Sequence, residues 1–285
     1  MVKAGVPVLM CNGDVRGEKE IANDATKPSI VLQRGGRRIG IIGYINPETA
    51  YRSYPGHTQF LNDKECVRRE AQRLHGEGVN IIIALGHSGL EEDKRIATEV
   101  PLVDVVVGGF SHYYMYSGSP LAIAAEPIHG PYPVVVQRPD GTQALVVTAF
   151  WFGKYMGNLE VVFDHKGNMV SYKGSPVLMD STVKEERAEN TRLAKSLEMA
   201  RAQADADRNR AVGSTKVLLE GSRQRCRLEE CPMGNLLADA LFKWYAGLAS
   251  ADDRLWGPVN GAIVPARDIH SSVDERLTNG GSRPS

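Results

Sequence analysis

The chain has 285 residues, of which 42% are hydrophobic and 24% are charged, a composition typical of a folded globular protein. Its 34 basic residues balance 34 acidic ones, so the formal net charge is zero and gives no electrostatic basis for binding nucleic acid or a membrane surface. No apolar run approaches the roughly 18 residues of a transmembrane helix, and no signal peptide is visible at the N-terminus.

The first part of the chain alternates apolar runs with charged, helix-forming segments. Because Ile39–Gly43 is almost wholly apolar, it is expected to be a central strand buried on both faces. Alternation of strand and helix predicts a parallel central sheet. The predicted strands are 7–10, 30–33, 38–44, 79–85 and 103–107, and the predicted helices are 63–76 and 90–100.

The pattern then changes twice. Strands at 133–137, 144–150 and 158–163, separated by short turns, predict an antiparallel meander that forms the second face of the domain. Residues 182–210 contain no Gly or Pro and predict one long helix, either a connector between domains or an ordinary surface helix. After it, strands at 216–220 and 262–264 and an amphipathic helix at 235–246 predict a second unit.

Two apolar strands each end in glycine and are followed by a histidine. Ile81–Leu85 runs into Gly86-His87, and Val105–Val107 runs into a loop that contains His112. Since neighbouring parallel strands end at one edge of a sheet, both side chains are expected at one crevice, where α/β folds build metal and phosphate sites. The alternative is that His87 is an ordinary loop histidine.

Several motifs in a consistent order resemble the 5'-nucleotidase/apyrase family of calcineurin-like metallophosphoesterases. The resemblance is closest to ecto-5'-nucleotidases and secreted salivary apyrases, and it extends from Pro7 onward. It implies a partial metallophosphoesterase-like αββα sandwich, a linking helix and the start of a second α/β domain, truncated at both ends. The motifs are Gly86–Gly89 with Asp93, Val103–Gly109, Phe152–Gly157, Gly221-Ser222 and Cys226–Asn235.

The resemblance also implies a two-metal site, but this chain contains few of the residues that would bind the metals. The Asp-x-His pair, the bridging Asp and the Gly-Asn-His-Glu segment have no counterpart here, so no catalytic residue is assigned to the chain. His87 matches a metal ligand, but Phe110 stands where the family has its next histidine. His112 lies two residues further on, about 7 Å along an extended chain, and is interpreted as a rim or surface histidine unless the loop shifts.

By the same resemblance, the second unit contributes substrate recognition. Arg227 is expected to contact the substrate phosphates, because a guanidinium makes bidentate bonds with phosphate oxygens. The alternative is that this arginine belongs to a solvated basic surface. Cys226 and Cys231 are close enough in the sequence to form a disulfide, and His270 stands where the family has a substrate-binding arginine.

These observations predict three parts: a partial metallophosphoesterase-like domain at 1–181, a linking helix at 182–210 and a partial 5'-nucleotidase C-terminal domain at 211–285. The resemblance implies an extracellular or cell-surface hydrolase that removes phosphate from nucleotides such as AMP, ADP or ATP. It also implies divalent metal ions, with zinc first and magnesium or calcium as alternatives, and a possible homodimer.

The chain alone is expected to be inactive. The competing hypotheses are a non-catalytic, secreted nucleotide-binding or scavenging protein and a truncated gene model.

Overall fold

The structure is a computed structural model that describes residues 5–18, 25–118, 126–180, 188–210, 213–248, 259–269 and 271–274. The chain divides into two compact units, Met1–Lys184 and Glu185–Ser285. Each unit has its own cluster of buried apolar residues. The predicted mixed α/β class is confirmed, whereas the assignment of the units to particular domains stays a prediction.

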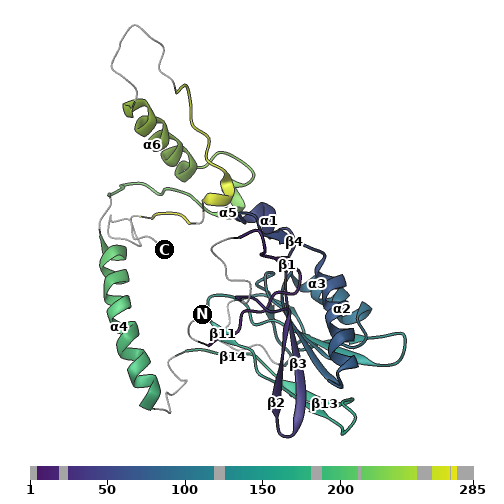
Figure 1. Ribbon diagram of the computed structural model, residues 1–285. Coiled ribbons are helices and arrows are strands. Elements are labelled where there is room, and N and C mark those ends of the chain that lie inside the picture. Colours follow the sequence, from purple (N-terminus) through teal and green to yellow (C-terminus); the bar gives the residue numbers. More distant parts are fainter. Residues whose placement is uncertain are drawn as a thin grey trace. The chain divides into compact units, whose positions relative to one another are not determined.

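A six-stranded sheet organises the first unit (Figure 1). β3, β5, β6 and β10 are mutually parallel, and β2 and β9 pair antiparallel at the two sides. Gly35 and Gly36 both have positive φ, which suits the tight turn of the β2–β3 hairpin. In spatial order the strands are β2 (Ser29–Arg34), β3 (Arg37–Ile45), β5 (Ile81–His87), β6 (Val105–Val107), β10 (Gln143–Val147) and β9 (Val134–Gln137).

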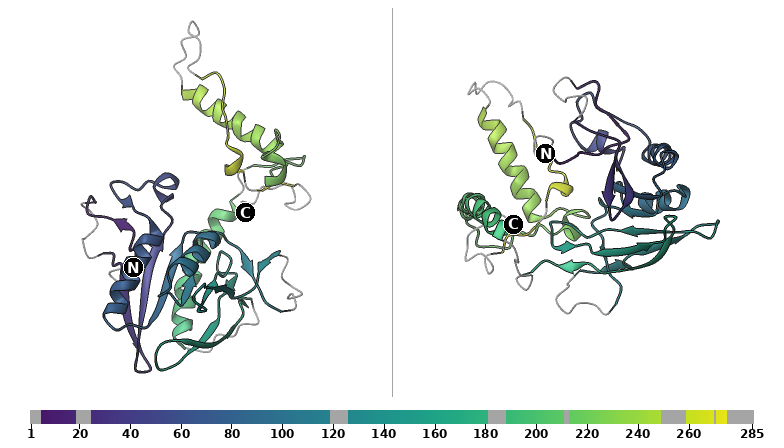
Figure 2. Two further views of the ribbon diagram at one scale, coloured as in Figure 1. Left: turned by 90° about the vertical axis from the view of Figure 1, so that its right-hand side faces the viewer. Right: turned by 60° about the horizontal axis from the view of Figure 1, so that its bottom comes forward.

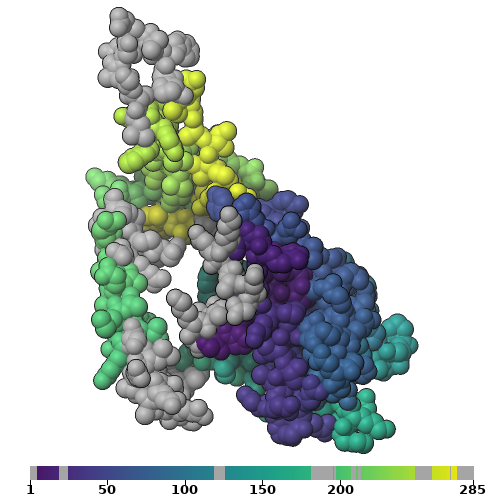
Figure 3. Space-filling view, viewed as in Figure 1, coloured from purple at the N-terminus to yellow at the C-terminus, as the bar shows by residue number. Residues whose placement is uncertain are grey.

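Two helices cover one face of this sheet, α2 (Asp63–Gly76) and α3 (Leu90–Glu99). Figures 1 and 2 show them side by side, and in Figure 3 they form a continuous surface, coloured blue. Alternate strand residues point toward the helices, as the period of a strand requires. The fully buried side chains of this layer include Ile42, Val67, Leu74, Ile82, Ile96 and Val106.

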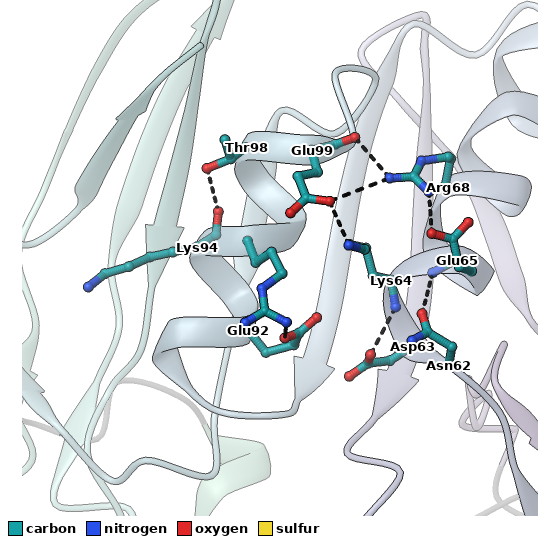
Figure 4. Close-up of polar contacts among 10 residues, drawn as sticks. Asn62, Asp63, Lys64, Glu65, Arg68, Glu92, Lys94, Thr98 and Glu99 are labelled. Carbon is teal, nitrogen blue, oxygen red and sulfur yellow. Dashed lines mark hydrogen bonds and ion pairs between the residues drawn. The ribbon is translucent and has the colours of Figure 1, made fainter.

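Polar side chains join α2 to α3 at the surface (Figure 4). Lys64 Nζ donates to Glu99 Oε2 at 2.5 Å, and Arg68 donates to the Glu99 carbonyl at 3.3 Å. Asn62 caps α2 by accepting from the Glu65 backbone N–H at 2.9 Å. Since most of these groups contact solvent, each ion pair contributes at most about 1 kcal/mol to stability, and the buried apolar layer dominates.

The second face of the sheet departs from the predicted meander. β9 and β10 form an antiparallel hairpin, but β10 pairs parallel to β6 and so extends the main sheet. Among the described strands, β12 (Leu159–Phe163) pairs with β13 (Met169–Gly174) alone. The predicted meander was wrong because β10 is apolar after its exposed first residue, Gln143; Ala144 to Val147 are buried and suit an interior position. A largely apolar cavity of about 460 Å³ is lined by Ile83, Val105, Val107, Val147, Leu159, Val161 and Phe163.

The remaining elements of the first unit are short. The predicted strand at 7–10 is reduced to one bridge between Leu9 and Lys27, because this segment divides its backbone hydrogen bonds between Lys27 and Gly43. The short elements are α1 (Thr49–Arg52) and the strand pairs β1 (Gly13–Asp14) with β4 (Gln59–Phe60), β7 (Tyr114–Met115) with β8 (Ile128–Gly130), and β11 (Tyr155–Met156) with β14 (Val177–Leu178).

The second unit is mainly helical in its described part. Its elements are α4 (Ala188–Asn209), α5 (Arg223–Cys226), α6 (Pro232–Leu248) and a 3-10 turn, η2 (Ala266–Asp268). The predicted strand at 216–220 is only a bridge between Leu219 and Val273, and no strand forms at 262–264. Neither segment has a longer neighbour with which to form a ladder among the described residues. No helix within those residues is long and apolar enough to cross a membrane.

Candidate functional site

The carboxyl-terminal edge of the main sheet holds the residues that the sequence singled out. His87 is the last residue of β5 and pairs in register with Ile45, the last residue of β3. The loops after β6 and β10 begin at Gly108 and Thr148. Because these strands are parallel neighbours, their following loops meet at one edge, where α/β folds place their sites.

His87 is exposed and lies against Phe110. The two rings meet edge to face, with centroids 5.6 Å apart. The guanidinium of Arg52 lies 5.4 Å from the centroid of the Phe110 ring, a cation–π distance. Gly109 makes this packing possible, since a Cβ there would lie 2.8 Å from His87 Nδ1. The nearest aromatic neighbour of the predicted ligand is therefore a side chain that cannot bind a metal.

His112 packs elsewhere. Its ring packs at a tilt against Trp151 with centroids 4.7 Å apart, and Trp151 stacks in turn on Phe152 at 4.7 Å. Phe152 is 90% exposed, so the first residue of the Phe-Gly-Lys-Tyr motif does not pack into the core of the unit. The structure thus gives His87 and His112 different aromatic partners.

The two loops that carry these rings are locally strained. Among the described residues other than glycine, those with positive φ are Phe110, His112, Phe150 and Phe152, at 73°, 55°, 63° and 55°. Bulky side chains rarely adopt this conformation, which costs on the order of 1–3 kcal/mol at each position. Strain of this kind concentrates at functional sites, so both loops are candidates for contact with a ligand.

A buried acid lies beneath the same edge and was missed as a structural feature. The Tyr44 hydroxyl donates to Asp93 Oδ1 at 2.5 Å, and Asp93 Oδ2 has no hydrogen-bond partner among the residues that the structure describes. Burial raises the pKa of Asp93 to about 7, aided by the charges of Asp63 and Glu92, whereas the Tyr44 bond lowers it. A Cβ on Gly108 would lie 1.9 Å from Asp93 Oδ2, so the carboxyl group fits closely against that glycine.

The described residues do not fit a divalent metal by themselves. They contain no group of three or more His, Cys, Asp or Glu side chains arranged to hold an ion. His87 is a single imidazole beside a phenylalanine. A two-metal centre requires several oxygen and nitrogen ligands, so no catalytic step through a metal follows from these residues.

The second unit holds the other predicted residues around a disulfide between Cys226 and Cys231. Both cysteines pack with Ile269 in the unit's apolar cluster. Arg227 lies between the two cysteines in the sequence and is exposed; no hydrogen bond or ion pair involves its side chain within the described part of the chain. Arg225, in contrast, is bound to Glu229 at 2.9 Å.

His270 lies outside the described residues, so its predicted role is not addressed by the structure. Its neighbours Ser271 to Val273 follow the turn η2, and Ser272 Oγ accepts from the Gly221 backbone N–H at 2.8 Å. This contact joins the segment that follows η2 to the Gly221-Ser222 motif.

Comparison with protein-family models gives no match. The chain is 39% identical to a snake venom 5'-nucleotidase of Crotalus adamanteus, over 97% of this chain and 46% of that protein. It is 40% identical to a 5'-nucleotidase of Rattus norvegicus, over 95% of this chain and 46% of that protein. A solved structure of a 5'-nucleotidase precursor from Thermus thermophilus matches with a TM-score of 0.73 and 34% identity, covering 87% of this chain and 48% of that one. The chain thus spans about half the length of these relatives.

Proposed function

Because the chain is homologous to the 5'-nucleotidases over nearly its whole length, we propose that its protein removes phosphate from extracellular nucleotides, in the manner of a 5'-nucleotidase or an apyrase. The observation that carries this proposal is the sequence identity over 97% of the chain. The name of the venom relative supports an extracellular location. AMP, ADP and ATP are the proposed substrates.

Within this function, Arg227 is the proposed phosphate-binding residue of the chain. Its side chain is exposed and has no partner among the described residues, whereas the neighbouring Arg225 is held by Glu229. Attachment to the disulfide fixes the backbone on both sides of Arg227, which lowers the entropy lost when the guanidinium binds an anion. His270 is proposed as a second contact.

The chain alone is proposed to be catalytically silent, with His87 as one imidazole ligand of a metal centre that needs further groups. The lack of a cluster of metal-ligating side chains in the described residues supports this. The packing of Phe110 against His87 also favours a second candidate function, a secreted protein that binds nucleotides without hydrolysing them. His112 is then a rim residue packed against Trp151.

One pair of measurements tests these proposals. Phosphate release from AMP and ADP is measured with Zn²⁺, Mg²⁺ or Ca²⁺, against His87→Ala as control. We expect no release above that control, and release well above it would show that the chain is a complete catalyst.

Nucleotide affinity is measured by calorimetry for Arg227→Ala and for the matched variant Arg225→Ala. Loss of charge-assisted bonds predicts about a tenfold or greater weakening for the first and little change for the second. Equal effects would contradict the role of Arg227.

A further inference from the structure

Two cysteines outside the disulfide lie against each other in the first unit. Cys11 is half-buried in the segment before β1, and Cys66 is buried in the first turn of α2. Although 55 positions separate them, Cys66 Sγ donates to the Cys11 carbonyl oxygen at 2.6 Å. The two thiol groups also interact, since each shifts the pKa of the other. The fold therefore places the Cys66 thiol against Cys11, a contact that no pattern in the sequence predicts.

The surroundings of the pair distinguish the two sulfurs. Arg69, on the same helix, donates from Nη2 to Cys66 Sγ at 3.1 Å. The hydrogen bond from Cys11 lowers the pKa of the Cys66 thiol, as does the Arg69 charge, although burial opposes them. The contact with Cys66, together with burial, raises the pKa of Cys11. Cys66 is thus the better thiolate, and the half-buried Cys11 is the more accessible sulfur.

The backbone around Cys11 is held in place rather than free to swing away. The Cys11 N–H donates to the Gly43 carbonyl at 2.8 Å. The next residue, Asn12, is fully buried and bonds through its side chain to the backbone of Ile45 and of Leu61 at 2.8–3.0 Å. Leu61 lies just before α2. These bonds keep the Cys11 segment beside the helix that carries Cys66.

We propose that Cys11 and Cys66 are a redox modification site, which a small organic disulfide converts into a second, reversible disulfide. Cys11 Sγ attacks one sulfur of the reagent as its proton passes to the Cys66 thiolate beside it; the other half of the reagent leaves and takes this proton from Cys66. The Cys66 thiolate then attacks Cys11 Sγ and expels the second half of the reagent as a thiol. Two electrons pass to the reagent, and the two protein protons leave on the two released thiols, so the exchange balances.

The test uses the full chain and oxidised glutathione as the reagent. After incubation, remaining thiols are blocked with N-ethylmaleimide, and the protein is digested without reduction and mapped by mass spectrometry. We expect a cross-linked pair of peptides containing Cys11 and Cys66, an unchanged Cys226–Cys231 peptide, and recovery of both thiols on mild reduction. Two alkylated thiols, a persistent glutathione adduct on Cys11, or pairing of either residue with Cys226 or Cys231 would overturn the proposal.

A matched pair of arginine variants tests the mechanism. Arg69→Gln removes the donor to Cys66, so the closing step is expected to slow several-fold and the glutathione adduct on Cys11 to accumulate. Arg68→Gln alters a neighbouring arginine that contacts Glu65 and Glu99 instead, and the closing rate is expected to stay unchanged. Equal closing rates in the two variants would contradict the role of Arg69.

Discussion

Replacing Asp93 by Asn is expected to change how the stability of the first unit depends on pH. The pKa of Asp93 is raised from 3.8 to about 7 by burial, so the folded state keeps a proton that the unfolded chain releases. Between these two values, stability falls as pH rises, and above about pH 7 the loss is complete. A shift of about three units corresponds to a loss of about 4 kcal/mol, an upper figure for one buried carboxyl.

A second carboxyl provides the matched comparison. Asp104 lies just before β6, accepts from the Ile82 backbone N–H at 2.8 Å, and has its pKa raised to about 7 by burial. Each aspartate contributes a slope of up to about −1.4 kcal/mol per pH unit between pH 5 and 6.5. A carboxyl with a lowered pKa, such as Glu70, changes the stability only below pH 4.5, its ordinary pKa, and so does not contribute to the slope between pH 5 and 6.5. Burial also raises the pKa of Glu92, which adds to the same slope. Asp93→Asn should therefore reduce the slope by up to about 1.4 kcal/mol per pH unit, and the double variant should reduce it by up to about twice as much.

The assay is urea unfolding at several pH values, followed by the fluorescence of Trp151. Trp244 and Trp256 are replaced by Phe, so that the signal reports the first unit alone. Asp93→Asn keeps an oxygen that can accept from Tyr44, which limits other effects of the change. If the slope of Asp93→Asn equals that of the parent between pH 5 and 6.5, the buried, proton-binding carboxyl is not present and the reasoning fails.

Two further changes test the packing of each unit. Gly108→Ala should destabilise the first unit by about 1–3 kcal/mol in a thermal melt, because its Cβ would lie 1.9 Å from Asp93 Oδ2. Gly76, at the end of α2, has open space around it, so Gly76→Ala should be neutral or stabilising in the same melt. A similar loss in both would show that the close contact is not responsible. Replacing Cys226 and Cys231 together by Ser should destabilise the second unit by about 2 kcal/mol, because the disulfide restricts a short loop in the unfolded chain. Circular dichroism should show a lower melting temperature of α6, and an unchanged melting temperature would contradict this expectation.

The sequence predicted the elements whose pattern is local and regular. The helix at 63–76 has the predicted limits, and the β2–β3 hairpin forms around its two glycines, because periodicity and turn chemistry are properties of neighbouring residues. The partner of a strand is not such a property, which explains why β10 was assigned to the wrong layer. The contact of Cys11 with Cys66 could likewise not be predicted, because it depends on how the chain folds far from either residue in the sequence. The backbone of Cys11 is hydrogen-bonded to Gly43 of β3, and this position places it beside the start of α2.

The glycines that first indicated a site at the sheet edge serve a different purpose in the structure. A glycine beside a histidine suggests open space next to the imidazole, but a Cβ on Gly86 would lie 1.9 Å from the Tyr44 ring, and one on Gly108 equally close to Asp93. Tyr44 and Asp93 are hydrogen-bonded to each other beneath both loops. The two glycines are therefore required by a buried tyrosine–aspartate pair that connects β3 to α3. At this edge Gly109, next to His87 Nδ1, does make room for a histidine. A Gly-His pattern at a strand end is thus explained here by core packing first, and its chemistry has to be argued from the side chains that surround the imidazole.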